Sequence, residues 1–136
     1  MEINEAKYYD FDGNIKTIPF DKNNIMTIDK NCFLHTYNDK PARVFLGLAE
    51  FYYKNGILHR ENNKPAIVTY NVKEKTINTE EFYVNGKHHR TNGPAEVNYF
   101  RHNGEPCIYY YFIRGIEIEK EDFDIMKNRI MMLEEV

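Results

Sequence analysis

The chain is short of the residues and runs that mark several protein classes. Its 136 residues include no Trp and only two cysteines, and no stretch approaches the ~20 apolar residues of a membrane-spanning helix. The charged stretch MEINEAKYYDFDG at the N-terminus argues against a secretory signal. The lack of a long apolar run predicts no membrane association. Cys32 and Cys107 have no CxxC partner, so we expect two reduced thiols and an intracellular, cytoplasmic location.

Neither sign of charge dominates. The 18 Lys and Arg residues and 21 Asp and Glu residues give a formal net charge of −3, which argues against a general binder of nucleic acids and other polyanions. Hydrophobic residues make up 42% of the chain, enough for a folded core at this low charge. The length predicts one domain spanning residues 1–136.

The motifs of common enzyme classes are missing. The sequence has no glycine-rich phosphate loop, no Walker pattern and no HExxH. Cys32 lies near His35, and His102 near Cys107, but no protease signature surrounds either pair. We therefore predict a non-enzymatic protein with no catalytic residues and no cofactor. A hydrolase with scattered residues is an alternative that a deep pocket holding two groups of perturbed pKa would support.

The sequence does contain a repeated motif. The similarity spans EFYYKNGILHRENNKPAIV (Glu50–Val68) and EFYVNGKHHRTNGPAEV (Glu81–Val97). A less similar copy, NCFLHTYNDKPARV, precedes them, and a truncated copy, YYYFIRGIEI, follows them. Self-similarity at a steady spacing indicates one supersecondary unit used several times, here over about residues 31–118.

Each unit is predicted to be a β-hairpin. Asn55-Gly56 and Asn85-Gly86 lie between apolar residues, and Asn-Gly favours the type I′ turn, which needs positive φ at both central positions. A two-residue turn fixes the facing pairs: Tyr53–Leu58, Tyr52–His59, Tyr83–His88 and Phe82–His89. Further turns are predicted at Asp12-Gly13 and Asn103-Gly104.

A Pro-Ala pair follows each repeat histidine and opens a strand. Pro41, Pro65 and Pro94 lack a backbone donor, which suits the first residue of a strand. Alternating apolar residues then predict a sheet with one buried face, composed of Ala42, Val44, Leu46, Ala66, Val68, Tyr70, Ala95, Val97 and Tyr99.

The period becomes helical near the end of the chain. Phe123, Met126, Ile130 and Leu133 predict an amphipathic helix over about residues 120–133, packed on the sheet or over its last edge. Its Met-rich face (Met126, Met131 and Met132) is expected to fill core space. The predicted fold is mainly β, an antiparallel meander of repeated hairpins in a single sheet, with one C-terminal α-helix.

The pattern YxNGxxHRxxGPA, most complete from Asn85 to Ala95, resembles repeat proteins of giant viruses and some phages. It is also similar to MORN repeats, which stack hairpins into an elongated sheet. The standard MORN pattern has several more glycines per unit, and this chain has seven in total. The resemblance implies a MORN-like viral repeat protein without catalytic residues, and a host cell as its intracellular location.

The repeated residues are assigned structural roles: Asn55, Gly56, His59, Arg60, Pro65, Asn85, Gly86, His89, Arg90 and Pro94. Equivalent histidines, His35 included, lie about 10 Å apart if each unit adds two strands, so they cannot share one zinc ion. We expect each to hydrogen-bond a turn or a neighbouring backbone, and we predict no metal site. The two arginines are expected to pair with turn or acidic groups, with phosphate binding as the alternative.

The function predicted is a protein-interaction module that binds a host factor or a second copy through a sheet edge. Its exposed anchors are predicted to be Tyr52, Tyr83, His88, Arg101 and Tyr110. The alternative is a nucleic-acid binder that uses an aromatic and His-Arg face of the sheet, which the negative net charge disfavours.

Overall fold

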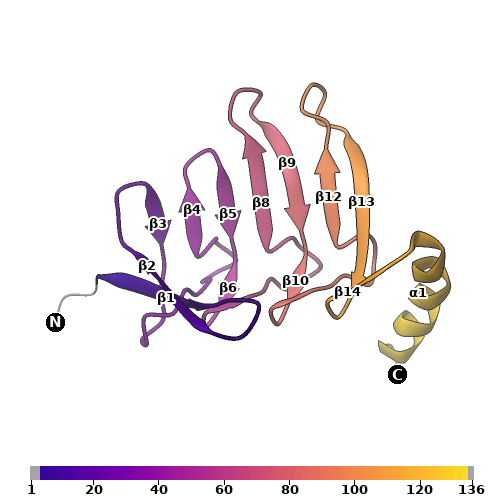
Figure 1. Cartoon of the computed structure of the whole chain (residues 1–136), viewed down its shortest axis with the longest axis horizontal. Helices are drawn as coiled ribbons and strands as arrows, with labels where there is room; N and C mark the ends of the chain where they lie inside the picture. Colours follow the sequence, from indigo (N-terminus) through magenta and orange to yellow (C-terminus); the bar gives the residue numbers. More distant parts are fainter. Residues whose placement is uncertain (1–3, 135–136) are drawn as a thin grey trace.

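The computed structural model describes residues 4–134, without the side chains of Asn128 and residues 130–134. Eight strands form one antiparallel sheet in the order β14-β13-β12-β9-β8-β5-β4-β3, and three further strand pairs, β1-β2, β6-β7 and β10-β11, lie beside it (Figure 1). The predicted mainly β antiparallel meander with one C-terminal helix is confirmed. The strands are β1 (Glu5–Tyr9), β2 (Ile15–Pro19), β3 (Asn24–Met26), β4 (Arg43–Phe45), β5 (Ala49–Phe51), β6 (Tyr53–Lys54), β7 (Ile57–Leu58), β8 (Ile67–Asn71), β9 (Thr76–Glu81), β10 (Tyr83–Val84), β11 (Lys87–His88), β12 (Glu96–Tyr99), β13 (Pro106–Ile113) and β14 (Ile116–Ile118).

The Asn-Gly turns form as predicted. Asn55 and Gly56 have φ of 47° and 84°, and Asn85 and Gly86 have φ of 51° and 81°. Tyr53 then pairs with Leu58, and Tyr83 pairs with His88. The turns at Asp12-Gly13 and Asn103-Gly104 join β1 to β2 and β12 to β13. Local turn chemistry therefore sets the register of the hairpins.

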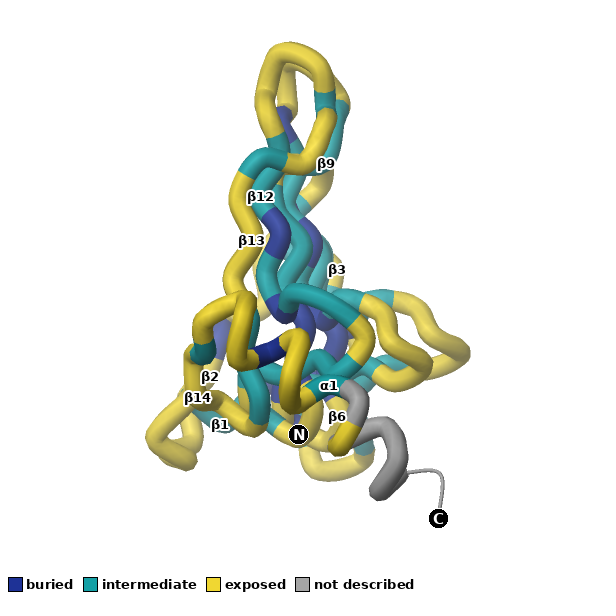
Figure 2. Tube along the Cα trace, turned by 90° about the vertical axis from the view of Figure 1, so that its right-hand side faces the viewer, coloured by how far each residue is buried: buried dark blue, intermediate teal, exposed yellow. Residues whose placement is uncertain are grey.

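The eight-stranded sheet forms a thin blade. It stands on a wider base made of the short hairpins β1-β2, β6-β7 and β10-β11 (Figure 1). Seen along the edge of the sheet, buried residues concentrate where the blade meets this base (Figure 2). Ala42, Ala66 and Ala95, the residues after the three repeat prolines, are fully buried and come directly before β4, β8 and β12. Small side chains at this level let the hairpins of the base pack closely against the blade.

One predicted core position is wrong. Leu46 is 68% exposed, because β4 ends at Phe45 and the chain turns, with the Leu48 N–H donating to the Phe45 carbonyl. The predicted alternation of buried residues therefore extends one residue past the end of β4. The other two strands of this series extend to Asn71 and Tyr99, so Tyr70 and Tyr99 do lie in β8 and β12.

The helix α1 spans Lys120–Glu134. Phe123 is 2% exposed and packs on Tyr111 of β13, with ring centroids 4.7 Å apart. Met126 is exposed, so the prediction that it fills core space is wrong. The other residues of the predicted apolar and Met-rich faces are not among the described side chains: Ile130, Met131, Met132 and Leu133. No helix within residues 4–134 is long and apolar enough to cross a bilayer.

Candidate functional site

The structure corrects the alignment of the second and third repeats. Glu50 accepts a hydrogen bond from the Tyr70 hydroxyl, and Glu80 accepts the equivalent bond from Tyr99. Glu50 therefore corresponds to Glu80 and not to Glu81 as the sequence alignment had it. With the Asn-Gly turns in register, the length difference lies in the turn before Pro94. We call Glu50–Val68 the second repeat and the segment 80–97 the third repeat.

Each repeat histidine contacts the hairpin of the following unit. Its Nδ1 accepts a backbone N–H: from Asn55 to His35 at 3.0 Å, from Asn85 to His59 at 2.9 Å, and from Arg114 to His89 at 2.8 Å. Because an N–H can only donate, Nδ1 must hold a lone pair in all three rings. The remaining proton of each neutral ring is therefore on Nε2.

His59 shows the electrostatic consequence. Its Nε2 is buried, has no hydrogen-bond partner among the described residues and lies 3.6 Å from Oε1 of Glu61. Burial lowers the pKa of His59 below its ordinary value of 6.5, against the opposing effect of Glu61. The neutral form that the turn requires is thus also the form that burial favours.

The repeat arginines make matching contacts in two units. Arg60 donates to the Pro65 carbonyl at 3.0 Å and to Asp39 of the preceding unit. Arg90 donates to the Pro94 carbonyl at 3.1 Å and to Asn63 of the preceding unit. Their guanidinium groups stack on Tyr52 and Phe82, 3.7 and 3.9 Å from the ring centroids. These donors are engaged within the chain, which leaves little of either guanidinium for phosphate.

The five residues predicted as exposed anchors do not form one surface. Tyr52 and Tyr83 are buried, so their prediction as exposed anchors is wrong. His88 is half-buried between other rings. Arg101 is exposed in the β12–β13 turn beside Glu74, and Tyr110 is exposed on β13. The aromatic strand pattern did not reveal which face the base hairpins would cover.

A row of facing residues crosses one face of the sheet, and its chemistry changes along the row. Phe51 pairs with Ile67, Ile67 with Glu81, and Glu81 with Glu96. In the second repeat Leu58 packs with Phe51 and Ile67 in the main core cluster. The third repeat has His88 in the place of Leu58.

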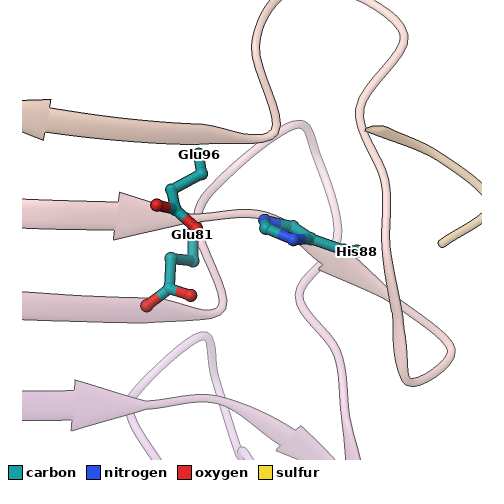
Figure 3. Close-up of side chains that lie close together, drawn as sticks. All are labelled: Glu81, His88 and Glu96. Atoms are coloured by element: carbon teal, nitrogen blue, oxygen red, sulfur yellow. The ribbon is translucent and has the colours of Figure 1, made fainter. Parts of the chain in front are cut away.

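Glu81, His88 and Glu96 form a cluster of ionisable side chains (Figure 3). One ligand atom of each lies within 4.8 Å of the others, and all three residues are half-buried. The two glutamates project from the neighbouring strands β9 and β12, and the His88 ring extends toward them from β11. Sequence analysis missed this Glu-His-Glu cluster. Aligning the repeats on their Asn-Gly turns would have shown it.

The cluster has unusual electrostatics. Burial and the neighbouring carboxylate of Glu96 raise the pKa of Glu81 to about 6. No ion pair joins Glu81 or Glu96 to a lysine or arginine within residues 4–134. Burial lowers the pKa of His88, whose ring is stacked between Tyr83 and Phe112 at centroid distances of 4.6 and 4.0 Å.

The outer edge of β13 is a second candidate site. The strand pairs with β12 over Pro106–Tyr110, but β14 covers its other side only from Tyr111 onward. Glu96 and Tyr110 face each other, and the Tyr110 carbonyl accepts the Ala95 N–H from the β12 side. Backbone groups alternate in direction along a strand, so the N–H and C=O of Tyr109 point to the open side.

The side chains at this edge are apolar and exposed. Ile108, Tyr109 and Tyr110 are 47%, 49% and 38% exposed. A hollow of about 320 Å³ adjoins them, lined by Tyr109, Tyr110, Tyr111, Glu117, Ile118, Glu119 and Lys120. Lys120 forms an ion pair with Asp124 at 2.9 Å, whereas Glu117 and Glu119 have no ion pair within the described part of the chain. The hollow therefore combines tyrosine rings with an acidic rim.

Comparisons with protein-family models, with curated proteins and with solved structures give no match for this chain.

Proposed function

We propose that the chain is a non-enzymatic protein-interaction module that binds an extended segment of a partner protein along the open edge of β13. The observation that carries this proposal is the stretch Pro106–Tyr110, whose outer edge pairs with no strand of residues 4–134 and offers backbone groups and exposed apolar side chains together (Figure 1). An added strand would pair with these backbone groups, and its side chains would contact the tyrosines.

The geometry favours a free peptide segment over a second copy of this chain. In every copy β14 occupies the same edge from Tyr111 onward. If two β13 strands met in antiparallel fashion about Tyr109, the β14 of each copy would limit pairing to about three residues. A parallel arrangement would bring the two β14 strands to the same place. A free segment has no such flanking strand and can pair along the whole open stretch.

The hollow beside the edge defines the chemistry of the partner. Glu117 and Glu119 favour a basic side chain, and Tyr109 to Tyr111 favour aromatic or β-branched side chains. The resemblance to giant-virus and phage repeat proteins, with MORN-like stacking of hairpins, makes a host-cell protein the partner to test first. We propose an intracellular site of action, in keeping with Cys32 and Cys107 as free thiols.

Selection from a library of displayed random peptides tests the proposal. We expect the wild-type chain to select peptides that alternate β-branched or aromatic residues and contain Lys or Arg. Binding should fall at least tenfold in Tyr109→Pro, which removes the outward N–H. Tyr109→Thr, which keeps that N–H and a strand-forming side chain, is the matched control and should lose less.

Two results would overturn the proposal. One is that the wild-type chain selects no peptide. The other is that selected peptides bind Tyr109→Pro as tightly as the wild type. A shift of single-stranded oligonucleotides at low salt, with no peptide binding, would favour the nucleic-acid alternative instead.

A further inference from the structure

The Glu-His-Glu cluster occupies positions that are apolar in the second repeat. Glu81, His88 and Glu96 stand where Phe51, Leu58 and Ile67 pack in the core cluster. The strand pairing is the same at these positions. Glu81 faces Glu96 as Phe51 faces Ile67, and the hairpin pairs Tyr83–His88 and Tyr53–Leu58 are equivalent. An apolar trio is therefore sufficient for the structural role of these positions.

The ionisable trio costs stability in the chain alone. Carboxylates that face each other directly across two strands repel, and burial removes water that would weaken the repulsion. No lysine or arginine of the described residues forms an ion pair with either glutamate. A divalent cation would supply the missing positive charge.

We infer that Glu81, His88 and Glu96 bind one divalent transition-metal ion. Their ligand atoms lie within 4.8 Å of one another, whereas ligands bound about 2.1 Å from a tetrahedral zinc ion lie roughly 3.4 Å apart. Binding therefore requires the glutamate side chains to move by about 1 Å. Both are half-buried and retain access to solvent.

The histidine is already held in place. Tyr83 and Phe112 clamp the His88 ring from both sides, with interplanar angles of 5° and 19°. Its Nε2 also contacts the Ala95 carbonyl at 2.9 Å. A carbonyl can only accept, so Nε2 carries the proton in this contact. The lone pair of the neutral ring is then on Nδ1, which is the nitrogen left to bind a metal ion. Such outer contacts orient metal-binding histidines.

The donor set selects the class of metal. One imidazole nitrogen and two carboxylate oxygens suit zinc and related first-row divalent ions, with water completing the coordination. Magnesium and calcium prefer oxygen ligands alone. This site is separate from the backbone groups of β13 on which the proposed function rests, so either proposal can fail without the other.

Calorimetric titration of the untagged full chain with ZnCl₂ tests the inference, with MgCl₂ as the control titrant. We expect one zinc ion per chain and no detectable magnesium binding. The triple variant Glu81→Phe/His88→Leu/Glu96→Ile restores the residues of the second repeat and should fold while losing zinc affinity at least 100-fold. Glu96→Gln, which keeps the shape of the side chain, should lose at least tenfold.

Thermal unfolding gives a second readout. Zinc should raise the Tm of the wild type and leave that of the triple variant unchanged. Without zinc, the triple variant should unfold at a higher temperature than the wild type. The inference is overturned if the wild type binds no zinc, if the triple variant binds it equally well, or if His102→Asn or Cys107→Ser abolishes binding, because the metal would then occupy an exposed site elsewhere.

Discussion

The Nδ1 atom of His59 accepts the backbone N–H of Asn85 at 2.9 Å, and so joins the second repeat to the turn of the third. Equivalent bonds from His35 and His89 make this contact a rule of the array. The type I′ turn of a hairpin leaves one backbone N–H without a partner in its own strand pair. The histidine of the preceding unit accepts a hydrogen bond from that N–H. The side chain that recurs in the sequence is thus the one that connects the units.

Replacing His59 should destabilise the fold. In His59→Ala the Asn85 N–H loses its acceptor at an exposed turn and the half-buried imidazole is removed, which together cost about 1 kcal/mol. His102→Ala, in an exposed turn, is the matched control and should change stability by less than about 0.5 kcal/mol. Urea unfolding measures both. Equal effects of the two variants would show that the His59 contact contributes nothing specific.

The contribution of His59 should weaken in acid. Its folded-state pKa lies below the ordinary 6.5 because of burial and Lys54, with Glu61 opposing. The unfolded chain therefore binds the proton first, and the stability from neutral His59, complete above pH 6.5, is lost progressively below it. The difference in unfolding free energy between wild type and His59→Gln should shrink from pH 7.5 to pH 5.5. A difference that grows over this range would contradict the tautomer assignment.

Arg60 should not tolerate replacement by lysine. Its guanidinium bonds the Pro65 carbonyl and Asp39 while it stacks on Tyr52, a combination that one ammonium group cannot reproduce. We expect Arg60→Lys to lower the unfolding free energy by about 1–2 kcal/mol. Arg101→Lys, at an exposed position, provides the control and should be near neutral. Thermal denaturation that does not separate the two variants would refute this account of the stacked arginine.

Two glycines with nearly equal backbone angles should respond differently to alanine. Gly13 and Gly56 have φ of 83° and 84°, but a Cβ at Gly13 meets nothing within 4 Å, whereas one at Gly56 lies 2.4 Å from the Phe33 ring. Gly13→Ala should cost about 1–2 kcal/mol from backbone strain alone. Gly56→Ala should cost at least about 1 kcal/mol more because the ring must move. Equal costs in chemical denaturation would indicate that the turn does not pack on Phe33.

The local signals in the sequence predicted the hairpins and the helix because each depends on neighbouring residues. Asn55-Gly56 needs no distant partner to favour its turn, and Phe123 marks a helical face by spacing alone. Burial of Tyr52 and Tyr83 was not predictable in this way. Their exposure depends on which face the base hairpins cover, a matter of tertiary packing between segments far apart in the chain.

The candidate sites were missed for a related reason. The open stretch of β13 exists because β14 is shorter than the strand it pairs with, and no sequence pattern gave the point at which β14 ends. The Glu-His-Glu cluster needed an alignment of the repeats that was correct to one residue. A one-residue shift hid the fact that Glu81 replaces Phe51, since it placed Glu81 against Glu50.

Backbone amide hydrogen exchange at Tyr109 tests the proposed function most directly. In the free chain this N–H points to the open side of β13 and should exchange rapidly, whereas a peptide bound along the edge should slow its exchange at least tenfold. The Tyr110 amide, which faces β12, should be protected in both states. Slow exchange of Tyr109 in the free chain, or a bound peptide that protects other residues and leaves Tyr109 unchanged, would contradict strand addition at this edge.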